Sequence, residues 1–210
     1  MSAESTEWTD GAAAPPSRSP LRWLLRPLKY ATVSIGLFAG SVGGYWGYLQ
    51  YQGNFHPVVA GQVYRSAQPT RDDLRREYRE HGIRSVLNLR GAHRGERWYD
   101  EEVAGANELG MAHYDYPLSS KRVLTTRQMG ELLAIVRSAP KPLLIHCKEG
   151  ADRTALVAAL YRYALAGARP AEADSELTLL YGHFPYFGVR SVAMDQSFWA
   201  YVRDQEHGTN

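Results

Sequence analysis

The sequence contains little cysteine: Cys147 is the only one among its 210 residues. A single thiol excludes an intramolecular disulfide and a metal cluster held by cysteines. It also leaves Cys147 without a second thiol as a disulfide partner, so only an external reductant would reverse its oxidation.

Other patterns are absent too. The sequence has no internal repeat, no cluster of metal ligands, and neither the Walker nor the Rossmann glycine pattern of nucleotide-binding sites. We therefore expect no cofactor and no metal. The net charge of +2 gives no reason to expect a nucleic-acid partner. The chain is long enough for one α/β domain with a sizeable core and an extension.

One segment carries most of the chemistry. Leu143–His146 is apolar up to its histidine, the loop after it begins with Cys147, and Ala155–Tyr161 is rich in alanine and leucine. This order predicts a buried strand, a tight loop and a helix. Arg153 follows Cys147 after five intervening residues. Loop N–H groups at the start of a helix, together with one guanidinium, can surround an anion, so the segment predicts a phosphate-binding site.

Each residue type in this loop fits such chemistry. A thiolate is favoured at a helix N-terminus beside a cation, so Cys147 is the predicted nucleophile. Arg153 can hold two oxygens of a phosphoryl group with its planar guanidinium as the transition state forms. Gly150 gives the loop conformational freedom, and Thr154 can donate its hydroxyl to the departing sulfur. The residues predicted to bind the substrate are Lys148, Glu149, Gly150, Ala151, Thr154 and His146.

Together these residues resemble the signature H-C-x5-R-[ST] of the cysteine-dependent protein tyrosine phosphatase superfamily, and most of all its compact dual-specificity branch. Tyr64–Pro69 and Asn88–Gly91 are similar to segments of bacterial phosphatases of this branch. The resemblance covers about Val58–Tyr201 and implies an α/β fold in which helices flank a central, mostly parallel sheet. It further implies a phosphoric monoester hydrolase that works without metal through a cysteinyl-phosphate, with His146 orienting the loop by hydrogen bonding.

Three other interpretations compete with this one. Cys147 could be a buried core residue, which would leave the loop unexplained. A rhodanese-like sulfurtransferase also places a cysteine before a helix, but its loop is typically shorter than the one between Cys147 and Arg153. A phosphatase-like module could bind phosphorylated ligands with weak catalysis. Ala155 stands where the family often has glycine, a change that a helix tolerates.

The sequence leaves the general acid open. Dual-specificity enzymes usually take it from an aspartate on a loop well before the cysteine, whereas that loop here, Leu118–Leu124, has no carboxylate. We favour Asp152, because the D-R-T ending resembles myotubularin-like and Sac-like phosphoinositide phosphatases, in which this residue has been considered an acid. Asp152 could instead pair with a basic neighbour or cap the helix. Asp115 is the other substitute, but it lies on a predicted strand and could point away from the site.

The substrate class stays open as well. The D-R-T ending and the missing acid favour a phosphorylated lipid, inositol or sugar, whereas the branch as a whole also acts on phosphorylated protein. Lys148 would add positive charge at the rim of the site, and Glu149 would offset it. Arg90 or Arg94, at the end of a predicted strand, could approach the substrate.

The N-terminal part of the sequence is asymmetric in charge. Ala31–Leu49 is nineteen residues without charge, close to the ~20 that a spanning helix needs. The segment predicts a transmembrane helix with the N-terminus in the cytoplasm and the rest of the chain extracytoplasmic, which is periplasmic in a bacterium. A weak homodimer could form through its G-x-x-x-G repeat. The basic residues before the segment are Arg18, Arg22, Arg26 and Lys29, and the repeat consists of Gly36, Gly40 and Gly44.

Two alternatives to a permanent anchor exist. Ala39–Ser41 and Ser41–Gly43 carry small residues at the spacing that signal peptidase prefers, so the segment could be a cleaved signal peptide. A core helix in water is disfavoured, because each glycine in it costs roughly 1 kcal/mol relative to alanine. We divide the chain into a disordered tail at 1–29, a transmembrane anchor or signal segment at 30–51, a linker at 52–57 and a phosphatase domain at 58–210.

Periodicity and turn residues predict the elements of this domain. Thr70 is expected to cap the first helix and Gly82 to end it. The aromatic segment Tyr181–Phe187 is expected to close the core, with the wall of the pocket as the alternative, and His183 is expected to be a structural histidine. Inward positions of the second helix are Trp98, Val103, Ala106 and Leu109. Residues 58–67 are predicted to form a strand or a hairpin. Further strands are predicted at 83–91, 111–118 and 143–146, and helices at 70–80, 96–109, 125–137, 155–161, 171–180 and 194–202.

Overall fold

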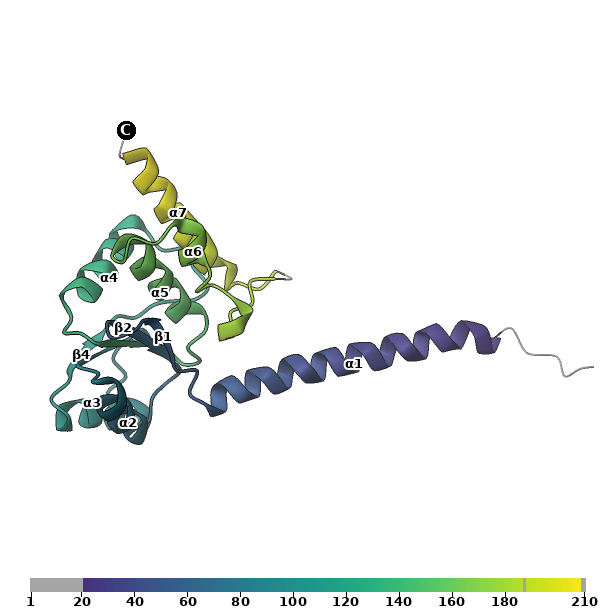
Figure 1. The fold of residues 1–210 in the computed structure, drawn as a ribbon, viewed down its shortest axis with the longest axis horizontal. Coiled ribbons are helices and arrows are strands. Elements are labelled where there is room, and N and C mark those ends of the chain that lie inside the picture. The colour runs from purple at the N-terminus through teal and green to yellow at the C-terminus, as the bar shows by residue number, and fades with distance from the viewer. Residues whose placement is uncertain (1–20, 187, 209–210) are drawn as a thin grey trace, which may run out of the picture. The chain divides into compact units, whose positions relative to one another are not determined.

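The computed structural model of the chain describes residues 21–186 and 188–208 (Figure 1). The predicted tail at 1–29 lies largely outside these residues. Its last part, from Leu21, belongs to a helix. The chain forms two compact units, one that ends at Gly44 and one that begins at Tyr45. The second unit contains the whole sheet.

The sheet has five strands in the order β1-β2-β5-β3-β4. β1 and β2 form an antiparallel hairpin, whereas the other three neighbouring pairs are parallel. This arrangement confirms the predicted α/β fold with a mostly parallel central sheet. The strands are β1 His56–Val59, β2 Val63–Ser66, β3 Ser85–Asn88, β4 Ala112–Asp115 and β5 Leu143–His146.

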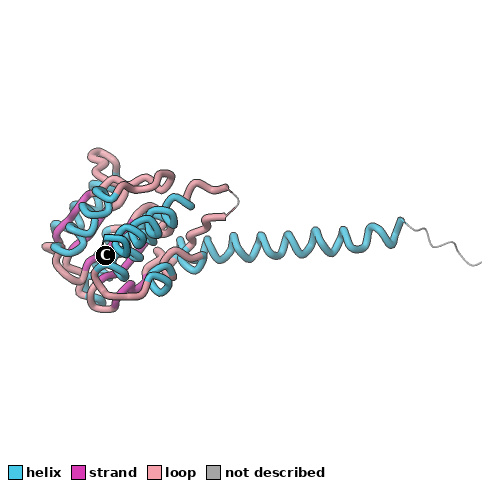
Figure 2. The backbone as a smooth tube through the Cα atoms, turned by 90° about the horizontal axis from the view of Figure 1, so that it is seen from above, coloured by secondary structure: helices cyan, strands magenta, loops and turns pink. Residues whose placement is uncertain are grey.

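Helices cover both faces of this sheet (Figure 1), and Figure 2 shows the helices, strands and loops from above. Val86 and Leu87 are neighbours on β3 but belong to separate apolar clusters, because successive side chains of a strand point to opposite faces. Val86 packs with Leu74 and Ala106, and Leu87 belongs to the larger cluster with Leu156. One face carries α2 Arg71–His81 and α3 Arg97–Glu108, and the other carries α4 Thr126–Ser138, α5 Asp152–Ala164, α6 Pro170–Asp174 and α7 Val192–Gly208.

The predicted helix limits of α2 are confirmed. Thr70 Oγ1 accepts a hydrogen bond of 3.1 Å from the Asp73 N–H, and the Thr70 N–H donates to the Asp73 carboxylate at 2.9 Å. This reciprocal capping box satisfies two N–H groups that the first helical turn cannot. Gly82 ends the helix with a φ of 67°, in the left-handed region that favours glycine.

Two predictions about helices are wrong in part. The helix expected at 171–180 stops at Asp174 and is followed by the 3-10 turn η1 Leu179–Tyr181. The carbonyl of Glu176 accepts from Arg65 at 3.1 Å, so it is diverted from helical pairing. In α3 the buried side chains are Tyr99, Glu102 and Ala106, whereas Trp98 and Val103 are only half-buried. Leu109, just after the helix, packs against the apolar cluster of Ala106 as predicted. α3 buries the face that carries Glu102, because the Glu102 carboxylate bonds two histidines inside the domain.

The aromatic segment does not fill the core as predicted. Phe184 and Tyr186 are 37% and 60% exposed, and their rings contact each other with centroids 5.2 Å apart. His183, just before them in the sequence, is fully buried, as expected of a structural histidine.

The N-terminal helix α1 spans Leu21–Tyr51. Among the described residues, no helix combines the length and the apolar character that crossing a membrane requires, so the predicted transmembrane anchor is not supported. Ala31–Leu49 is uncharged, but its five glycines and its hydroxyl-bearing side chains add little hydrophobicity. The homodimer predicted through that anchor loses its basis for the same reason.

The end of α1 belongs to the compact unit of the sheet. Leu49 is buried, and the Tyr45 hydroxyl donates to the Leu180 carbonyl at 2.7 Å. The unit therefore begins before residue 52, the start of the predicted linker.

Candidate active site

The predicted phosphate-binding loop, residues 147–151, joins the end of β5 to the start of α5. Ser66 of β2 and Asn88 of β3 both pair with His146, so the ends of three parallel strands meet beside Cys147. Residues that follow β2 and β3 along the chain are thereby placed around the loop. The position of the site follows from the parallel arrangement of the strands.

Gly150 makes the closest approach between the loop and β2. Its φ is +69°, and a Cβ at this position would lie 2.6 Å from the carbonyl carbon and oxygen of Ser66. Glycine is therefore required here both for its backbone conformation and for space. The predicted need for glycine in the loop is explained by this contact.

The carbonyl groups of the loop are bonded by the surrounding protein. The Lys148 carbonyl accepts from the Gln68 N–H at 3.2 Å, and the Glu149 carbonyl accepts from Asn54 Nδ2 at 3.0 Å. The Gly150 carbonyl accepts from Arg65 Nη2 at 2.8 Å. In the described part of the chain, no group accepts from the N–H groups of residues 148–153. These six donors remain available to an anion.

Arg65 is the buried support of this loop, a role that its place in the sequence did not predict. Its side chain is fully buried and pairs with the Glu176 carboxylate at 2.7 Å. The guanidinium also lies 4.1 Å from the centre of the Tyr181 ring. A buried arginine without such a partner would be strongly destabilising. The available signal was an arginine inside the otherwise apolar pattern of β2, next to a segment already similar to the family.

Arg153 lies across the ends of two other strands. Its Nη1 donates to the Leu89 carbonyl at 3.3 Å and to the Leu118 carbonyl at 3.4 Å. Both acceptors are neutral, so the positive charge of Arg153 is not cancelled by them. Cys147 is 3% exposed at the start of the same loop. Thr154 Oγ1 is buried and has no hydrogen-bond partner among the described residues, which suits a hydroxyl reserved for the reaction.

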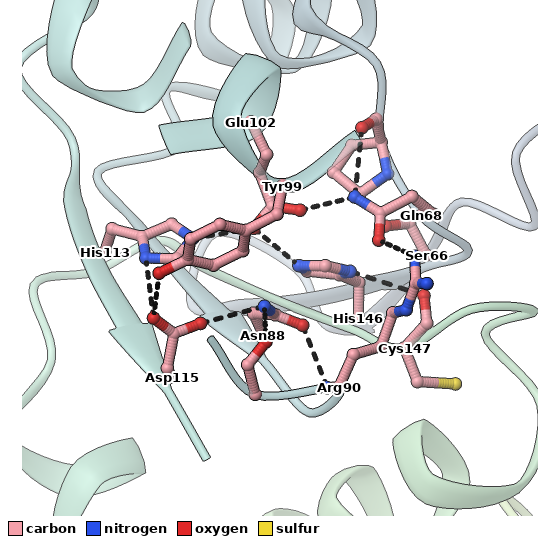
Figure 3. A network of polar contacts seen from close by, with 12 residues as sticks. Ser66, Gln68, Asn88, Arg90, Tyr99, Glu102, His113, Asp115, His146 and Cys147 are labelled. Carbon is pink, nitrogen blue, oxygen red and sulfur yellow. Dashed lines mark hydrogen bonds and ion pairs between the residues drawn. The ribbon is translucent and has the colours of Figure 1, made fainter. Parts of the chain in front are cut away.

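Figure 3 shows a buried polar network behind Cys147, centred on Glu102. The Glu102 carboxylate lies 3.1 Å from His146 Nε2 and 2.6 Å from His113 Nε2, and it accepts from the Gln68 amide. Burial raises the pKa of Glu102, but the charge of His146 and these hydrogen bonds outweigh it and lower the pKa to about 2. A stable carboxylate thus fixes the ring of His146, whose Nδ1 faces the Cys147 carbonyl at 3.3 Å. The predicted orienting position of His146 agrees with this geometry.

Asp115 belongs to the same network and is not a free acid (Figure 3). It accepts from Asn88 Nδ2 at 2.8 Å and from the Tyr99 hydroxyl at 2.6 Å. Burial, followed by the hydrogen bond to Asp115, raises the pKa of Tyr99 to about 12. Asp115 is therefore a structural residue at the end of β4. This agrees with its position on a predicted strand, which already argued against a role as the acid.

Asp152 is paired with a basic neighbour. Its carboxylate lies 2.7 Å from His183 Nδ1, and Asp195 of α7 lies 2.9 Å from His183 Nε2. Burial lowers the pKa of His183, but hydrogen bonds to both carboxylates outweigh it and raise the pKa to about 9. The imidazole of His183 lies between the two aspartates and engages the side chain of Asp152 directly. This pairing argues against Asp152 as a proton donor, the role that we favoured from the sequence.

The exchange Asp152→Asn is expected to lower stability more than catalysis. Losing one charged hydrogen bond to His183 should reduce the free energy of unfolding by about 1–3 kcal/mol. The raised pKa of His183 stabilises the folded chain fully below pH 6.5, and this stabilisation is lost as the pH rises through about 9. The fall in melting temperature over this range should be smaller in Asp152→Asn than in the wild type.

Asp195→Asn is the matched control, because it removes the other carboxylate from the same histidine. The two variants should resemble each other in their melting curves. They should also resemble each other in their rate on an aryl phosphate and in their rate on an alkyl phosphate. A rate loss in Asp152→Asn alone that deepens with alkyl phosphates would show that Asp152 is the acid after all.

Lys148 and Glu149 lie at the rim, as predicted. Their side chains are 70% and 44% exposed, and the Lys148 ammonium lies 4.0 Å from the Glu149 carboxylate. The two charges offset each other, so Lys148 adds little net attraction for an anion.

This fold and this loop define the chain as a cysteine-dependent phosphatase of the dual-specificity type, a hydrolase of phosphoric monoesters. Residues 55–185 match the family model described as "DSP-PTPase phosphatase fused to NAD+ Kinase", and the chain belongs to this family. None of the curated proteins compared with the chain matches it.

Solved structures share the fold at low identity. TpbA from P. aeruginosa is 21% identical over 71% of this chain and 91% of its own, with a TM-score of 0.51. The core catalytic domain of the PP-IP phosphatase SIW14 from S. cerevisiae is 19% identical over 75% of this chain and 93% of its own, with a TM-score of 0.54. PTPMT1 is 16% identical over 73% of this chain and 99% of its own, with a TM-score of 0.55.

Proposed function

We propose that the chain hydrolyses phosphomonoesters in two steps with Cys147 as the nucleophile. In the first step Sγ attacks phosphorus, the P–S bond forms and the P–O bond breaks, and the leaving oxygen takes up a proton. In the second step water attacks phosphorus, the P–S bond breaks and phosphate leaves. Thr154 donates its hydroxyl to the departing thiolate, while Arg153 and the loop N–H groups hold the equatorial oxygens in both steps.

The observation that carries this proposal is the set of unpartnered N–H groups around the only cysteine. The carbonyl groups of the same loop accept hydrogen bonds from Gln68, Asn54 and Arg65. These bonds hold the loop in place while its N–H groups stay available to an anion. Donors fixed before the substrate arrives cost no reorganisation when negative charge develops on the phosphoryl oxygens. The arrangement supports transfer of a phosphoryl group rather than a role of Cys147 as an unreactive core residue.

The state of the two aspartates bears on the leaving group. Asp152 and Asp115 are both engaged by other side chains, so neither is positioned by the structure to protonate the leaving oxygen. We propose that the chain turns over aryl phosphates faster than alkyl phosphates, because an aryl oxygen needs less protonation as it leaves.

We propose phosphorylated protein or a phosphorylated lipid or inositol as the substrate. Among the structural neighbours, TpbA has been crystallised with pTyr, PTPMT1 with PI(5)P, and SIW14 is a PP-IP phosphatase. These ligands belong to those proteins and cover both classes. Ranking kcat/KM for a phosphotyrosine peptide against vesicles that carry a monophosphorylated phosphoinositide decides between them. Activity confined to the peptide would contradict the lipid class.

The reaction itself is tested with phenyl phosphate and the full chain. We expect release of phosphate and, after an acid quench, a phosphoryl adduct on the peptide that contains Cys147, detected by mass spectrometry. Binding of inorganic phosphate without any hydrolysis would support the phosphatase-like binding module instead.

We also propose that the domain is exported, a location supported by the basic residues before the uncharged segment of α1. With a membrane span unsupported, a cleaved signal peptide is the route that remains from the sequence. An alkaline-phosphatase fusion after Gln205 should be active in a bacterial host. Fluorescence of a fluorescent-protein fusion at the same position, without alkaline-phosphatase activity, would contradict export.

A further inference from the structure

Arg90 lies beside the phosphate-binding loop but takes no part in the reaction described above. It follows β3, whose last residue Asn88 pairs with His146, and the Leu89 N–H donates to the His146 carbonyl at 2.9 Å. Figure 3 shows the Arg90 side chain next to Cys147, on the side of the network occupied by Gln68. The guanidinium is therefore at the edge of the site.

Neutral groups fix the position of this guanidinium. Its Cζ lies 3.3 Å from the centre of the Trp98 ring, and Nη1 donates to Gln68 Oε1 at 2.8 Å. Gln68 is itself held, because its amide nitrogen donates to the buried Glu102 carboxylate. The Arg90 N–H donates to Asn88 Oδ1 at 2.9 Å, which fixes the backbone as well. A long, flexible side chain is thus ordered before any ligand binds.

The charge of Arg90 has no carboxylate partner within ion-pair distance in the described part of the chain. By contrast, the buried Arg65 pairs with Glu176. Burial, and next the like charge of Arg153, lower the pKa of Arg90, so the two cations act on each other. Glu102 and Glu96 offset part of the charge of Arg90 at longer range. When one phosphoryl group lies in the loop beside Arg153, the hydrogen-bond donors of Arg90 are left for a second anionic group.

We propose that Arg90 forms a second anion-binding subsite, which takes a second phosphate group of the same substrate molecule while the first lies in the loop. The proposal rests on the proposed function and narrows it to substrates with two phosphate groups close together. A guanidinium that keeps most of its donors free suits a phosphate, since it can donate two parallel hydrogen bonds to it. A phosphoinositide headgroup and a free inositol bisphosphate share this chemistry.

Binding measurements test the subsite without relying on turnover. In the full chain with Cys147→Ser, calorimetry would give the Kd of inositol 4,5-bisphosphate, whose two phosphate groups are on neighbouring carbons, and of inositol 4-phosphate. Adding Arg90→Gln should raise the Kd of the bisphosphate about 10- to 100-fold, the factor expected when a charged hydrogen-bonded pair is lost. The Kd of the monophosphate should rise by a smaller factor, because only a screened, longer-range attraction disappears.

Arg84→Gln is the matched control, since Arg84 flanks the opposite end of β3 and also lies over an aromatic ring, that of Tyr78. It should leave both Kd values unchanged. Equal weakening of both ligands by Arg90→Gln, or no preference for the bisphosphate in the parent chain, would overturn the subsite. Sedimentation with phosphatidylcholine vesicles that carry phosphatidylinositol 4,5-bisphosphate distinguishes a lipid headgroup from the free compound. Hydrolysis is measured on the chain with Cys147, whereas these Kd values are measured on the Cys147→Ser chain. A failure of the proposed hydrolysis is therefore distinguishable from a failure of the subsite.

Discussion

The exchange Cys147→Ser is expected to abolish turnover of every phosphate ester that the wild-type chain hydrolyses. A serine hydroxyl is not ionised near neutral pH, and His146, the nearest candidate base, is already held by Glu102 and the Cys147 carbonyl. Removing a nucleophile that works within a catalytic unit lowers kcat by roughly 10⁴- to 10⁶-fold. Phosphate release from phenyl phosphate, followed over hours, measures the loss.

Binding of inorganic phosphate provides the control for this variant. The loop N–H groups and Arg153 do not depend on the sulfur, so the Kd of phosphate should stay close to that of the wild type. Loss of both binding and turnover would mean that the exchange distorts the loop. Turnover that persists within tenfold of the wild type would show that Cys147 is not the nucleophile.

The exchange Gly150→Ala is expected to collapse the phosphate site and to destabilise the fold. The added Cβ would lie 2.6 Å from the Ser66 carbonyl, and the backbone φ of +69° is unfavourable for alanine. Overpacking typically costs about 1–3 kcal/mol and a strained left-handed residue about 1–2 kcal/mol, so we expect a loss of about 2–5 kcal/mol in the free energy of unfolding. Urea unfolding and calorimetric phosphate binding would measure both effects.

Gly110→Ala separates these two costs. Gly110 has a φ of +65°, but a Cβ there would meet no atom within 4 Å. Its exchange should cost only the backbone part, about 1–2 kcal/mol, and should leave phosphate binding intact. Equal destabilisation in the two variants, with binding kept in both, would contradict the role assigned to the contact between the loop and β2.

The segment before β1 has consequences for experiments on the domain. Gln50 Nε2 and Asn54 Nδ2 both donate to the Glu149 carbonyl, at 3.2 and 3.0 Å. The Tyr45 hydroxyl bonds the segment that leads to His183. A fragment beginning at Gln52 would lose the contacts of Tyr45 and Gln50 while keeping Asn54. The full chain is therefore the appropriate protein for measuring the properties of the loop.

Much of the fold was predictable because the signals are local. Capping residues, a glycine after each of several helices and apolar runs identified the elements of the sheet and most helices to within a few residues. The predicted orientation of α3 failed at Glu102, which lies one turn from Tyr99 and from Ala106 and so shares their buried face. A carboxylate is expected to face water, and only its contacts with His146 and His113 explain why it does not.

The sequence by itself determined the chemistry at the loop, since Cys147, Gly150, Arg153 and Thr154 lie within one strand-loop-helix segment and their spacing sets their geometry. The tertiary structure alone decided which charges are free. Arg65 meets Glu176 across 111 residues of sequence, and Asp152 meets His183 across 31. Pairing of this kind depends on how strands and helices pack, and no local pattern records it. For this reason the nucleophile could be predicted from the sequence, whereas the pairing of Asp152 and the unpaired charge of Arg90 could not.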